Sequence, residues 1–205
     1  MTSSNTEGKN IPEKPENAGE LEKQGLEGLV RALRDSTDPQ VRQYAAYLLG
    51  NAQNPRAIQP LIEALADFDK SVREQATLAL SRIGKAAIEP LAEAMKEPKW
   101  ETRYRAAEAL GKIADEKALK PLIQGLKDNR DHVRYMAVKG LKDLGDSDAI
   151  EPLIILLRDE NRHVRMMAVR ALGALGGKKA NEALNAALVA EQDGKVKEAI
   201  TEALK

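Results

Sequence analysis

The chain has 205 residues, of which 42% are apolar and 31% are charged, so it can build a sizeable core and still dissolve in water. Its 32 Lys and Arg residues balance 32 Asp and Glu residues, which makes a general nucleic-acid binder unlikely, and the absence of cysteine excludes disulfides, thiolate metal sites and cysteine nucleophiles. Without a run of about 18 apolar residues or an apolar signal segment, we expect a cytoplasmic protein with no membrane partner.

The first twenty residues differ in composition from the rest of the chain. Serine, asparagine, glycine, proline and charged residues dominate there, with almost no apolar side chain. Such a segment buries too little surface to offset the entropy of ordering it. We therefore predict a disordered N-terminal tail over residues 1–20 and a folded domain over residues 21–205.

From residue 21 onward the sequence repeats itself about every 31 residues. In one unit, Leu122, Ile123 and Leu126 have the spacing of a short helix, and a longer helical pattern runs from Val133 to Leu144. Each unit is therefore a helical hairpin, and four units have a proline in the first turn of the first helix, at Pro60, Pro90, Pro121 and Pro152. The expected units are about 28–59, 60–89, 90–120, 121–151, 152–182 and 183–205.

A single hairpin of this size cannot bury its own apolar stripe, but stacked hairpins share a continuous core. The expected fold is therefore all-α, an α-solenoid of six tandem antiparallel helix pairs. Helix-capping side chains precede four of the second helices, at Asp38, Asp69, Asn161 and Asp193. Lys99 and Arg130 occupy this position in the other two units, where weaker helix starts are expected.

The repeat resembles the short HEAT-like repeats of the phycobilin-lyase type. The pattern is carried by LKDNRDHVRYMAVKGLKDLGD (126–146) and LGKIADEKALKPLI (110–123), and it covers about residues 26–205. The resemblance implies a right-handed armadillo-type superhelix whose second helices line the concave face. Family members act as adapters, bilin lyase subunits or parts of larger enzymes. The first unit's longer turn and Ala190, at the acidic position of the last unit, depart from the pattern.

An acidic residue followed by an arginine recurs at the turn of most units. A guanidinium has five donors, so one arginine can bridge the turn of its own unit and that of the next. We expect a structural ladder between stacked repeats here and no acid–base machinery. Its predicted members are Asp35 with Arg42, Asp67 with Arg73, Glu97 with Arg103, Asp128 with Arg134, and Asp159 with Arg165, followed by Lys197.

The sequence contains no pattern that indicates catalysis. No glycine-rich phosphate loop or nucleophile elbow is present, and no serine has a histidine nearby. His132 and His163 occupy the same position in adjacent units, but only Asp131 and Glu160 could add ligands, whereas a catalytic zinc takes three from the protein. We therefore expect no catalytic residue, no metal and no cofactor.

The few aromatic residues gather on one side of the second helices. The positions just after each Val-Arg pair, and four residues further on, face away from the core and hold all four tyrosines. Tyr, Trp, Met and Arg are enriched in protein interfaces. The alternative is that some members, especially Met136 and Met167, fill gaps between repeats. The predicted partner-binding residues are Tyr44, Tyr47, Trp100, Tyr104, Arg105, Tyr135, Met136, Lys139, Met166, Met167 and Arg170.

These features predict a non-catalytic scaffold or adapter that binds a peptide or protein surface on the face formed by the second helices. The charges of Lys139 and Arg170 suggest that an acidic part of the partner lies toward the C-terminal units. The alternative is a lyase-like or chaperone subunit of an enzyme that holds a flat chromophore or cofactor against stacked tyrosines. Duplex DNA is a third candidate ligand, which Glu74 and Glu108 disfavour.

Overall fold

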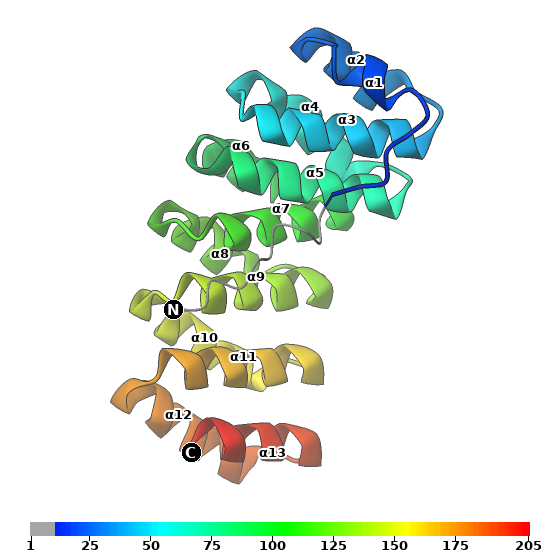
Figure 1. The fold of residues 1–205 in the computed structure, drawn as a ribbon. Helices are drawn as coiled ribbons and strands as arrows, with labels where there is room; N and C mark the ends of the chain where they lie inside the picture. Colours follow the sequence, from blue (N-terminus) through cyan, green and yellow to red (C-terminus); the bar gives the residue numbers. More distant parts are fainter. Residues whose placement is uncertain (1–10) are drawn as a thin grey trace, which may run out of the picture. The chain divides into compact units, whose positions relative to one another are not determined.

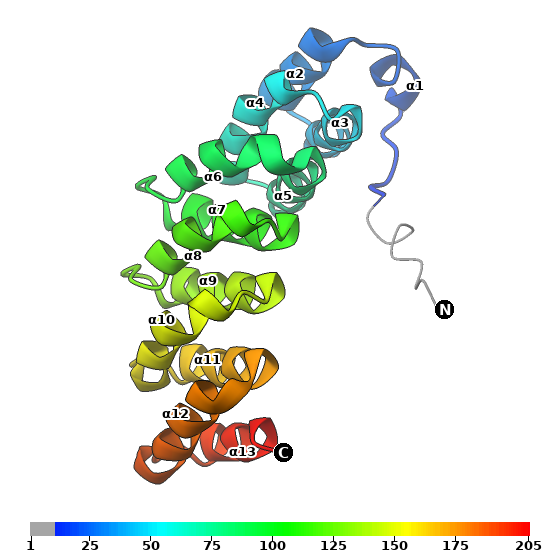
Figure 2. The same cartoon turned by 90° about the vertical axis from the view of Figure 1, so that its left-hand side faces the viewer.

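The computed structural model describes residues 11–205, and it places these residues in helices, turns and irregular segments with no strand (Figures 1 and 2). They form two compact units, unit 1 up to Ala87 and unit 2 from Ile88 to Lys205. Consecutive helices pair throughout, which confirms the predicted α-solenoid of helix pairs. None of the described helices is long and apolar enough to cross a membrane.

Unit 1 contains two helix pairs and a short N-terminal helix. The pairs are α2 with α3 and α4 with α5, and the second helices α3 and α5 pack along each other. Leu49, Leu61, Leu65 and Leu80 are fully buried and form the core between the pairs. The helices are α1 (Ala18–Leu21), α2 (Leu26–Asp35), α3 (Pro39–Ala52), α4 (Ile58–Glu63) and α5 (Lys70–Ile83).

Unit 2 contains four helix pairs. Its second helices, α7, α9, α11 and α13, pack side by side in chain order, and each contacts the first helix of its own pair. Leu110, Leu122, Leu141 and Leu153 are fully buried between the two layers. The helices are α6 (Ile88–Ala94), α7 (Trp100–Ile113), α8 (Leu119–Gly125), α9 (Asp131–Leu144), α10 (Ile150–Ile155), α11 (Arg162–Leu175), α12 (Gly177–Ala190) and α13 (Gly194–Ala203).

The four predicted caps of second helices are confirmed. Each side chain accepts a hydrogen bond from a backbone N–H in the first turn of its helix, the free donors that a cap satisfies. Lys99 and Arg130 make no such side-chain bond, as expected. The capping residues are Asp38 for α3, Asp69 for α5, Asn161 for α11 and Asp193 for α13.

The first helices begin earlier than the proline pattern indicates. A turn of 3-10 helix precedes α4, α8 and α10, and a polar side chain caps each of these turns. The prolines still lie in the first α-helical turn, where the missing N–H costs little. The caps are Asn54, Asp115 and Asp146, and the corresponding prolines are Pro60, Pro121 and Pro152.

Small residues let the second helices approach each other closely. A Cβ added to Gly111 of α7 would lie 2.7 Å from the Cα of Gly140 on α9, and one added to Gly50 of α3 would lie 2.6 Å from the Cα of Ala79 on α5. Both distances are below van der Waals contact. The same position is therefore small in both units because backbone packs against backbone there.

The predicted disordered tail is wrong for residues 11–20. Pro12, Pro15, Ala18 and Leu21 are buried, and α1 contacts α3. The average hydropathy of this stretch is low, but its buried side chains recur at every third residue. They give the stretch one apolar side that an average does not reveal. Residues 1–10, the rest of the predicted tail, lie outside the described part of the chain.

Candidate partner-binding faces

The predicted arginine ladder joins neighbouring turns within each unit. In unit 1, Arg42 donates two hydrogen bonds of 2.8 Å to the carboxylate of Asp67 in the next turn. In unit 2, Arg103 bonds Asp128 in the same forked geometry, and Arg134 bonds Asp159. The remaining guanidinium nitrogen donates to carbonyl oxygens of the arginine's own turn, as of Asp128 for Arg134. Each arginine thus spans two repeats.

Two predicted ladder positions are displaced by one residue. Asp35 is exposed and takes no part, because Arg42 donates to the Ser36 carbonyl oxygen. In the last repeat, Arg165 donates to Glu191, at 2.8 and 3.3 Å, and Glu191 is one residue after Ala190, which the sequence pattern had placed at the acidic position. The turns of the first and last repeats differ in length from the others, so the pattern placed the ladder residue one position too early in both.

Two further predicted pairs meet through backbone carbonyl oxygens. Arg73 donates to the carbonyl oxygens of Asp67 and Phe68 in its own turn. Arg103 donates to the carbonyl oxygen of Glu97 at 2.9 Å. In both pairs the arginine binds the backbone of its own turn.

Two acidic partners in the ladder have a lowered pKa. Burial acts to raise the pKa of Asp67, yet hydrogen bonds from Arg42 and the Asp69 backbone outweigh it and hold the pKa below its usual range. The pKa of Asp128 is lowered in the same way, against burial, by Arg103 and the Arg130 backbone. The arginine of the preceding repeat thus favours the charged form of each carboxylate.

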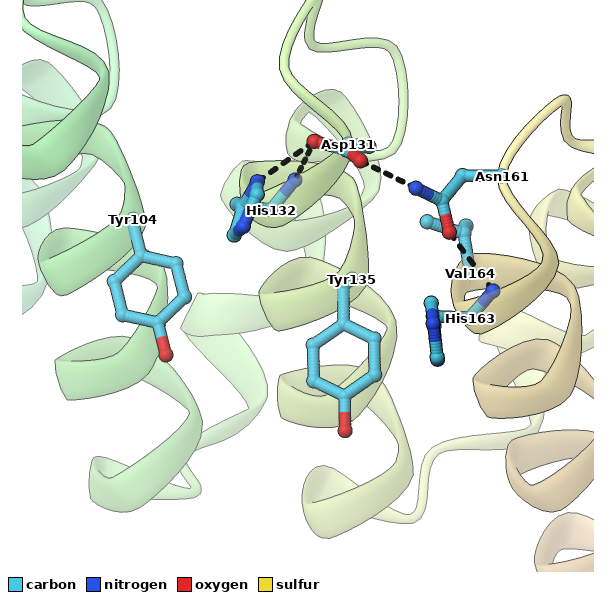
Figure 3. Close-up of a pocket in the computed structure, with 7 residues that line it drawn as sticks. All are labelled: Tyr104, Asp131, His132, Tyr135, Asn161, His163 and Val164. Atoms are coloured by element: carbon cyan, nitrogen blue, oxygen red, sulfur yellow. Dashed lines mark hydrogen bonds and ion pairs between the residues drawn. The ribbon is translucent and has the colours of Figure 1, made fainter.

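The second helices of unit 2 bring two predicted tyrosines together in a groove. Figure 3 shows Tyr104 on α7 and Tyr135 on α9 projecting in parallel, with the hydroxyl groups pointing the same way. The groove has a volume of about 350 Å³, and we call it the tyrosine groove. Its lining residues are Tyr104, Asp131, His132, Tyr135, Asn161, His163 and Val164.

Aromatic contacts extend the tyrosine groove along α7. The Trp100 ring meets the Tyr104 ring edge-on, with centroids 6.4 Å apart, and lies 5.4 Å from the His132 ring. The guanidinium of Arg105 lies over Tyr104 at 5.4 Å and donates to Glu108 at 2.8 Å. Burial, followed by the nearby Glu108 carboxylate, raises the pKa of Tyr104, so its hydroxyl stays a hydrogen-bond donor.

Hydrogen-bonded polar side chains at the start of α9 and α11 close one end of the tyrosine groove. Asp131 accepts from the side chain of Asn161 and lies 2.7 Å from Nδ1 of His132 (Figure 3). Burial acts to raise the pKa of Asp131, but the hydrogen bonds from His132 outweigh it and lower the pKa. Asn161 caps α11 at the same time, so the wall of the groove is tied to the helix start.

The other predicted residues of unit 2 divide into buried and accessible ones. Met136 and Met167 are only 5% and 6% exposed, so they pack within the helical layers as the alternative reading held. Met166, which follows Arg165 in α11, is half-buried. Lys139 is paired with Asp143 at 3.0 Å, and Arg170 is exposed beside a small hollow between α11 and α13.

The corresponding face of unit 1 is covered by the chain itself, which corrects the prediction for Tyr44. This tyrosine is 2% exposed, and its hydroxyl donates to Glu22 from the stretch just after α1. Lys14 donates to the same carboxylate at 2.7 Å. Tyr47 stacks on Tyr44 with centroids 5.8 Å apart, and it remains half-exposed. Sequence reasoning missed Glu22 and Lys14, although Pro12 and Pro15, which flank Lys14 closely, carried a signal.

No group of three or more His, Cys, Asp and Glu side chains is placed to hold a metal ion anywhere in residues 11–205. Within each unit the second helices form a layer of side-by-side helices whose outward side chains include rings and a few charges. Such a layer, built from tandem helix pairs, defines a helical-repeat protein of the α-solenoid class.

Comparison with known proteins places the chain within that class. The family model for HEAT repeats matches residues 26–97, 84–134 and 119–205, and the chain belongs to this family. It is similar to the phycocyanobilin lyase subunit alpha of Picosynechococcus sp., with 33% identity over 103 residues, which are 45% of this chain and 38% of that protein.

Two further proteins share the repeat. A HEAT repeat-containing taxis protein of Halobacterium salinarum is 43% identical over 65 residues, covering 30% of this chain and 16% of that protein. The chain thus spans less than half of the length of either curated relative. The complex of CpcE and CpcF of phycocyanin lyase from Nostoc sp. contains a chain with a TM-score of 0.68 and 24% identity, covering 74% of this chain and all of that one.

Proposed function

We propose that this protein is a non-catalytic scaffold that binds an extended segment of a partner protein along α7, α9 and α11 of unit 2. The observation that carries the proposal is the tyrosine groove. Tyr104 and Tyr135 remain half-exposed, whereas the next residue after Tyr135, Met136, is buried. Rings that are rigid and partly exposed supply much contact area for little lost entropy.

The spacing of the groove suits an extended chain. Neighbouring packed helices lie about 8–10 Å apart, and an extended chain advances about 3.3 Å per residue. A bound segment would therefore place about every third side chain against a new helix, with Tyr104 and Tyr135 serving successive contacts. The hydroxyl groups and His132 would meet its backbone or polar side chains.

The charges near the groove favour a segment that is acidic at one end. Arg105 is paired with Glu108, and Lys139 with Asp143, so these cations add little net attraction. Arg170 on α11 is exposed, and His163 lies on the same helix at the groove. An acidic side chain of the partner is therefore expected over α11.

A peptide library selected on the immobilised full chain tests this function. Trp100 is the only tryptophan and contacts Tyr104, so its fluorescence reports binding directly. Selected peptides should lose about 30-fold or more in affinity for the Tyr104→Ala/Tyr135→Ala variant, because ring anchors typically contribute about 2 kcal/mol or more together. The matched control is Tyr47→Ala, which removes a half-exposed ring from unit 1.

Two results would contradict the proposal. Peptides that bind the double variant within about threefold of the wild-type affinity would place the site elsewhere. A library that yields no binder responding in Trp100 fluorescence would remove the groove as a peptide site. Circular dichroism of each variant confirms that the helices are intact.

A second candidate is a flat conjugated ligand held against the same rings, in an accessory subunit of a chromophore lyase. It is supported by the 33% identity to a phycocyanobilin lyase subunit. Stacking on Tyr104 and Tyr135 would shift the visible absorbance of added phycocyanobilin and quench Trp100. A spectrum unchanged on mixing, or changed equally with the double tyrosine variant, would argue against this ligand.

A further inference from the structure

The second-helix face of unit 1 holds an extended segment of the same chain. Figure 1 shows the stretch before α1 running across α3 and α5, and we call residues 11–21 the N-terminal segment. Its first residues, Ile11 and Pro12, help to line a shallow groove of about 190 Å³. The α3 and α5 residues in this groove are Gln43, Ser71, Glu74, Gln75 and Leu78.

The N-terminal segment contains a Pro-x-x-Pro motif. Pro12 and Pro15 are buried, whereas the two residues between them are exposed, and a turn that starts at Pro15 leads into α1. A polyproline II helix has three residues per turn, so positions i and i+3 lie on one side. Pro-x-x-Pro segments dock in this conformation. The groove beside Pro12 is lined by polar and aliphatic side chains, and the covered Tyr44 lies on the same helix, α3.

Gln75 supplies a buried hydrogen-bond donor in this groove that the N-terminal segment does not pair. Its side chain is 3% exposed, it lines the groove beside Pro12, and its Nε2 has no hydrogen-bond acceptor in the described part of the chain. A buried amide donor left unpaired is costly. A polyproline II backbone carries unpaired carbonyl oxygens, and one placed over Gln75 would satisfy this donor.

The N-terminal segment is held by few contacts. Ile11 is 57% exposed, and the ion pair between Lys14 and Glu22 is exposed at both side chains. Exposed pairs contribute little, and only Ala18–Leu21 of this segment is helical, so residues 11–17 open locally more easily than the core. The groove can therefore be vacated while the helix pairs of unit 1 stay folded.

We propose that the α3–α5 face of unit 1 is a recognition site for an extended Pro-x-x-Pro segment of a partner protein, and that the N-terminal segment is its resident, exchangeable occupant. The site is separate from the tyrosine groove and does not depend on it. A partner segment competes by placing two prolines in the positions of Pro12 and Pro15 and by offering a carbonyl oxygen to Gln75.

The test uses the full chain and a fluorescein-labelled peptide with the sequence of residues 11–21, followed by anisotropy. The Pro12→Ala/Pro15→Ala chain, whose resident segment is weakened, should bind this peptide about tenfold or more tightly than the wild-type chain. A peptide in which both prolines are alanine should bind about tenfold or more weakly to the same variant. Adding Leu78→Glu to that chain should weaken binding of the proline peptide, whereas Gln75→Ala should not, because this sequence leaves the Gln75 Nε2 without an acceptor.

Equal affinity for the wild-type and proline-variant chains, or for the two peptides, would overturn the proposal. So would the absence of binding to the proline-variant chain at about 1 mM peptide. Tyr135→Ala in unit 2 is the matched control and should leave the peptide affinity unchanged, so this result and a failure of the tyrosine groove remain distinguishable. Far-UV circular dichroism verifies that each variant is folded.

Discussion

The second-helix faces of the two units use tyrosine in opposite ways. In unit 1, Tyr44 is covered by the chain's own N-terminal segment and bonded to Glu22. In unit 2, Tyr104 and Tyr135 remain half-exposed around a groove, with nothing from residues 11–205 bonded to their hydroxyl groups. Tyr44 stands one residue later in its repeat than Tyr104 and Tyr135 do in theirs, at the position of the buried Met136 and Met167, so repeat position separates the covered ring from the open ones.

The framework beneath these faces is the same in both units, and removing it should give the largest effect. The side chains of Arg134 and Asp159 are 10% and 6% exposed, so Arg134→Ala leaves a buried carboxylate unpaired. We expect a loss of about 3 kcal/mol in the free energy of unfolding, and a similar loss for Arg42→Ala in unit 1. Urea unfolding followed by circular dichroism measures both.

Two controls sharpen this prediction. Arg134→Lys keeps the charge but not the two-pronged geometry, so its loss should be intermediate. Lys178→Ala removes an ion pair whose side chains are 90% and 66% exposed and should change stability by less than about 0.5 kcal/mol. An unfolding midpoint of Arg134→Ala equal to that of the wild type would remove the ladder as a source of stability.

The second prediction separates the covered face from the open one. Leu21, at the end of α1, is 1% exposed, so Leu21→Ala deletes the best-buried anchor of the N-terminal segment. We expect the free energy of local opening of the segment to fall by about 2 kcal/mol, and its amide protons to exchange faster. Loss of a buried leucine costs about 2 kcal/mol or more, and part of this cavity can collapse. Hydrogen exchange read by mass spectrometry measures this protection peptide by peptide.

The change from Leu21→Ala should stay local. Peptides from α3 under the segment should exchange faster, whereas those from α9 and α11 should keep their wild-type rates. A uniform increase across both units would mean that the N-terminal segment belongs to the global core, and the contrast between the two faces would then fail.

The repeat framework was predictable from the sequence because its determinants are local and recur. Proline in the first helical turn, a capping Asp or Asn, and apolar residues at helical spacing appear in unit after unit, so one misjudged copy is corrected by the others. The displaced ladder positions at Ser36 and Glu191 lie in the first and last copies, where the turn length changes. These copies have a neighbouring repeat on one side only, so less of the pattern fixes their alignment.

The burial of Tyr44 was predictable only in part. Tyr44 lies at the repeat position of Gln75, Met136 and Met167, which are all buried, whereas Tyr104 and Tyr135 lie one position earlier in their repeats. What the repeat does not reveal is the stretch that bonds the Tyr44 hydroxyl, because this stretch occurs once and docks from outside the repeat. Periodicity reports how repeats pack on each other, but a single non-repeated segment leaves no period at the scale of a helix pair.

The third prediction tests the hydrogen bond that closes the covered face. Tyr44→Phe removes only the hydroxyl that donates to Glu22. A hydrogen bond to a charged acceptor contributes about 1–2 kcal/mol when partly solvated, so the N-terminal segment should lose about 1 kcal/mol of protection. Tyr135→Phe is the matched change in the open groove and should leave stability and exchange unchanged. Equal effects of the two variants would contradict the assignment of different roles.

The smallest expected effect is the pH dependence of the covered face. Hydrogen bonds from Lys14 and then from Tyr44 hold the pKa of Glu22 below its ordinary value of 4.5. A lowered pKa in the folded state stabilises attachment of the segment above pH 4.5, and this contribution is lost as the pH falls through the lowered pKa. Because the chain has no cysteine, a dye attached at Glu13→Cys reports the segment alone.

The mobility of that dye should rise as the solution is acidified below pH 4.5, before the helical signal changes. In the Glu22→Gln variant the neutral side chain cannot ionise, so the dye should be mobile at neutral pH and its profile should be flat over the same range. A wild-type profile as flat as that of the variant would show that the Glu22 carboxylate does not hold the segment. Attachment would then rest on the buried prolines, Ala18 and Leu21 alone, and Tyr44 would be covered for reasons of packing.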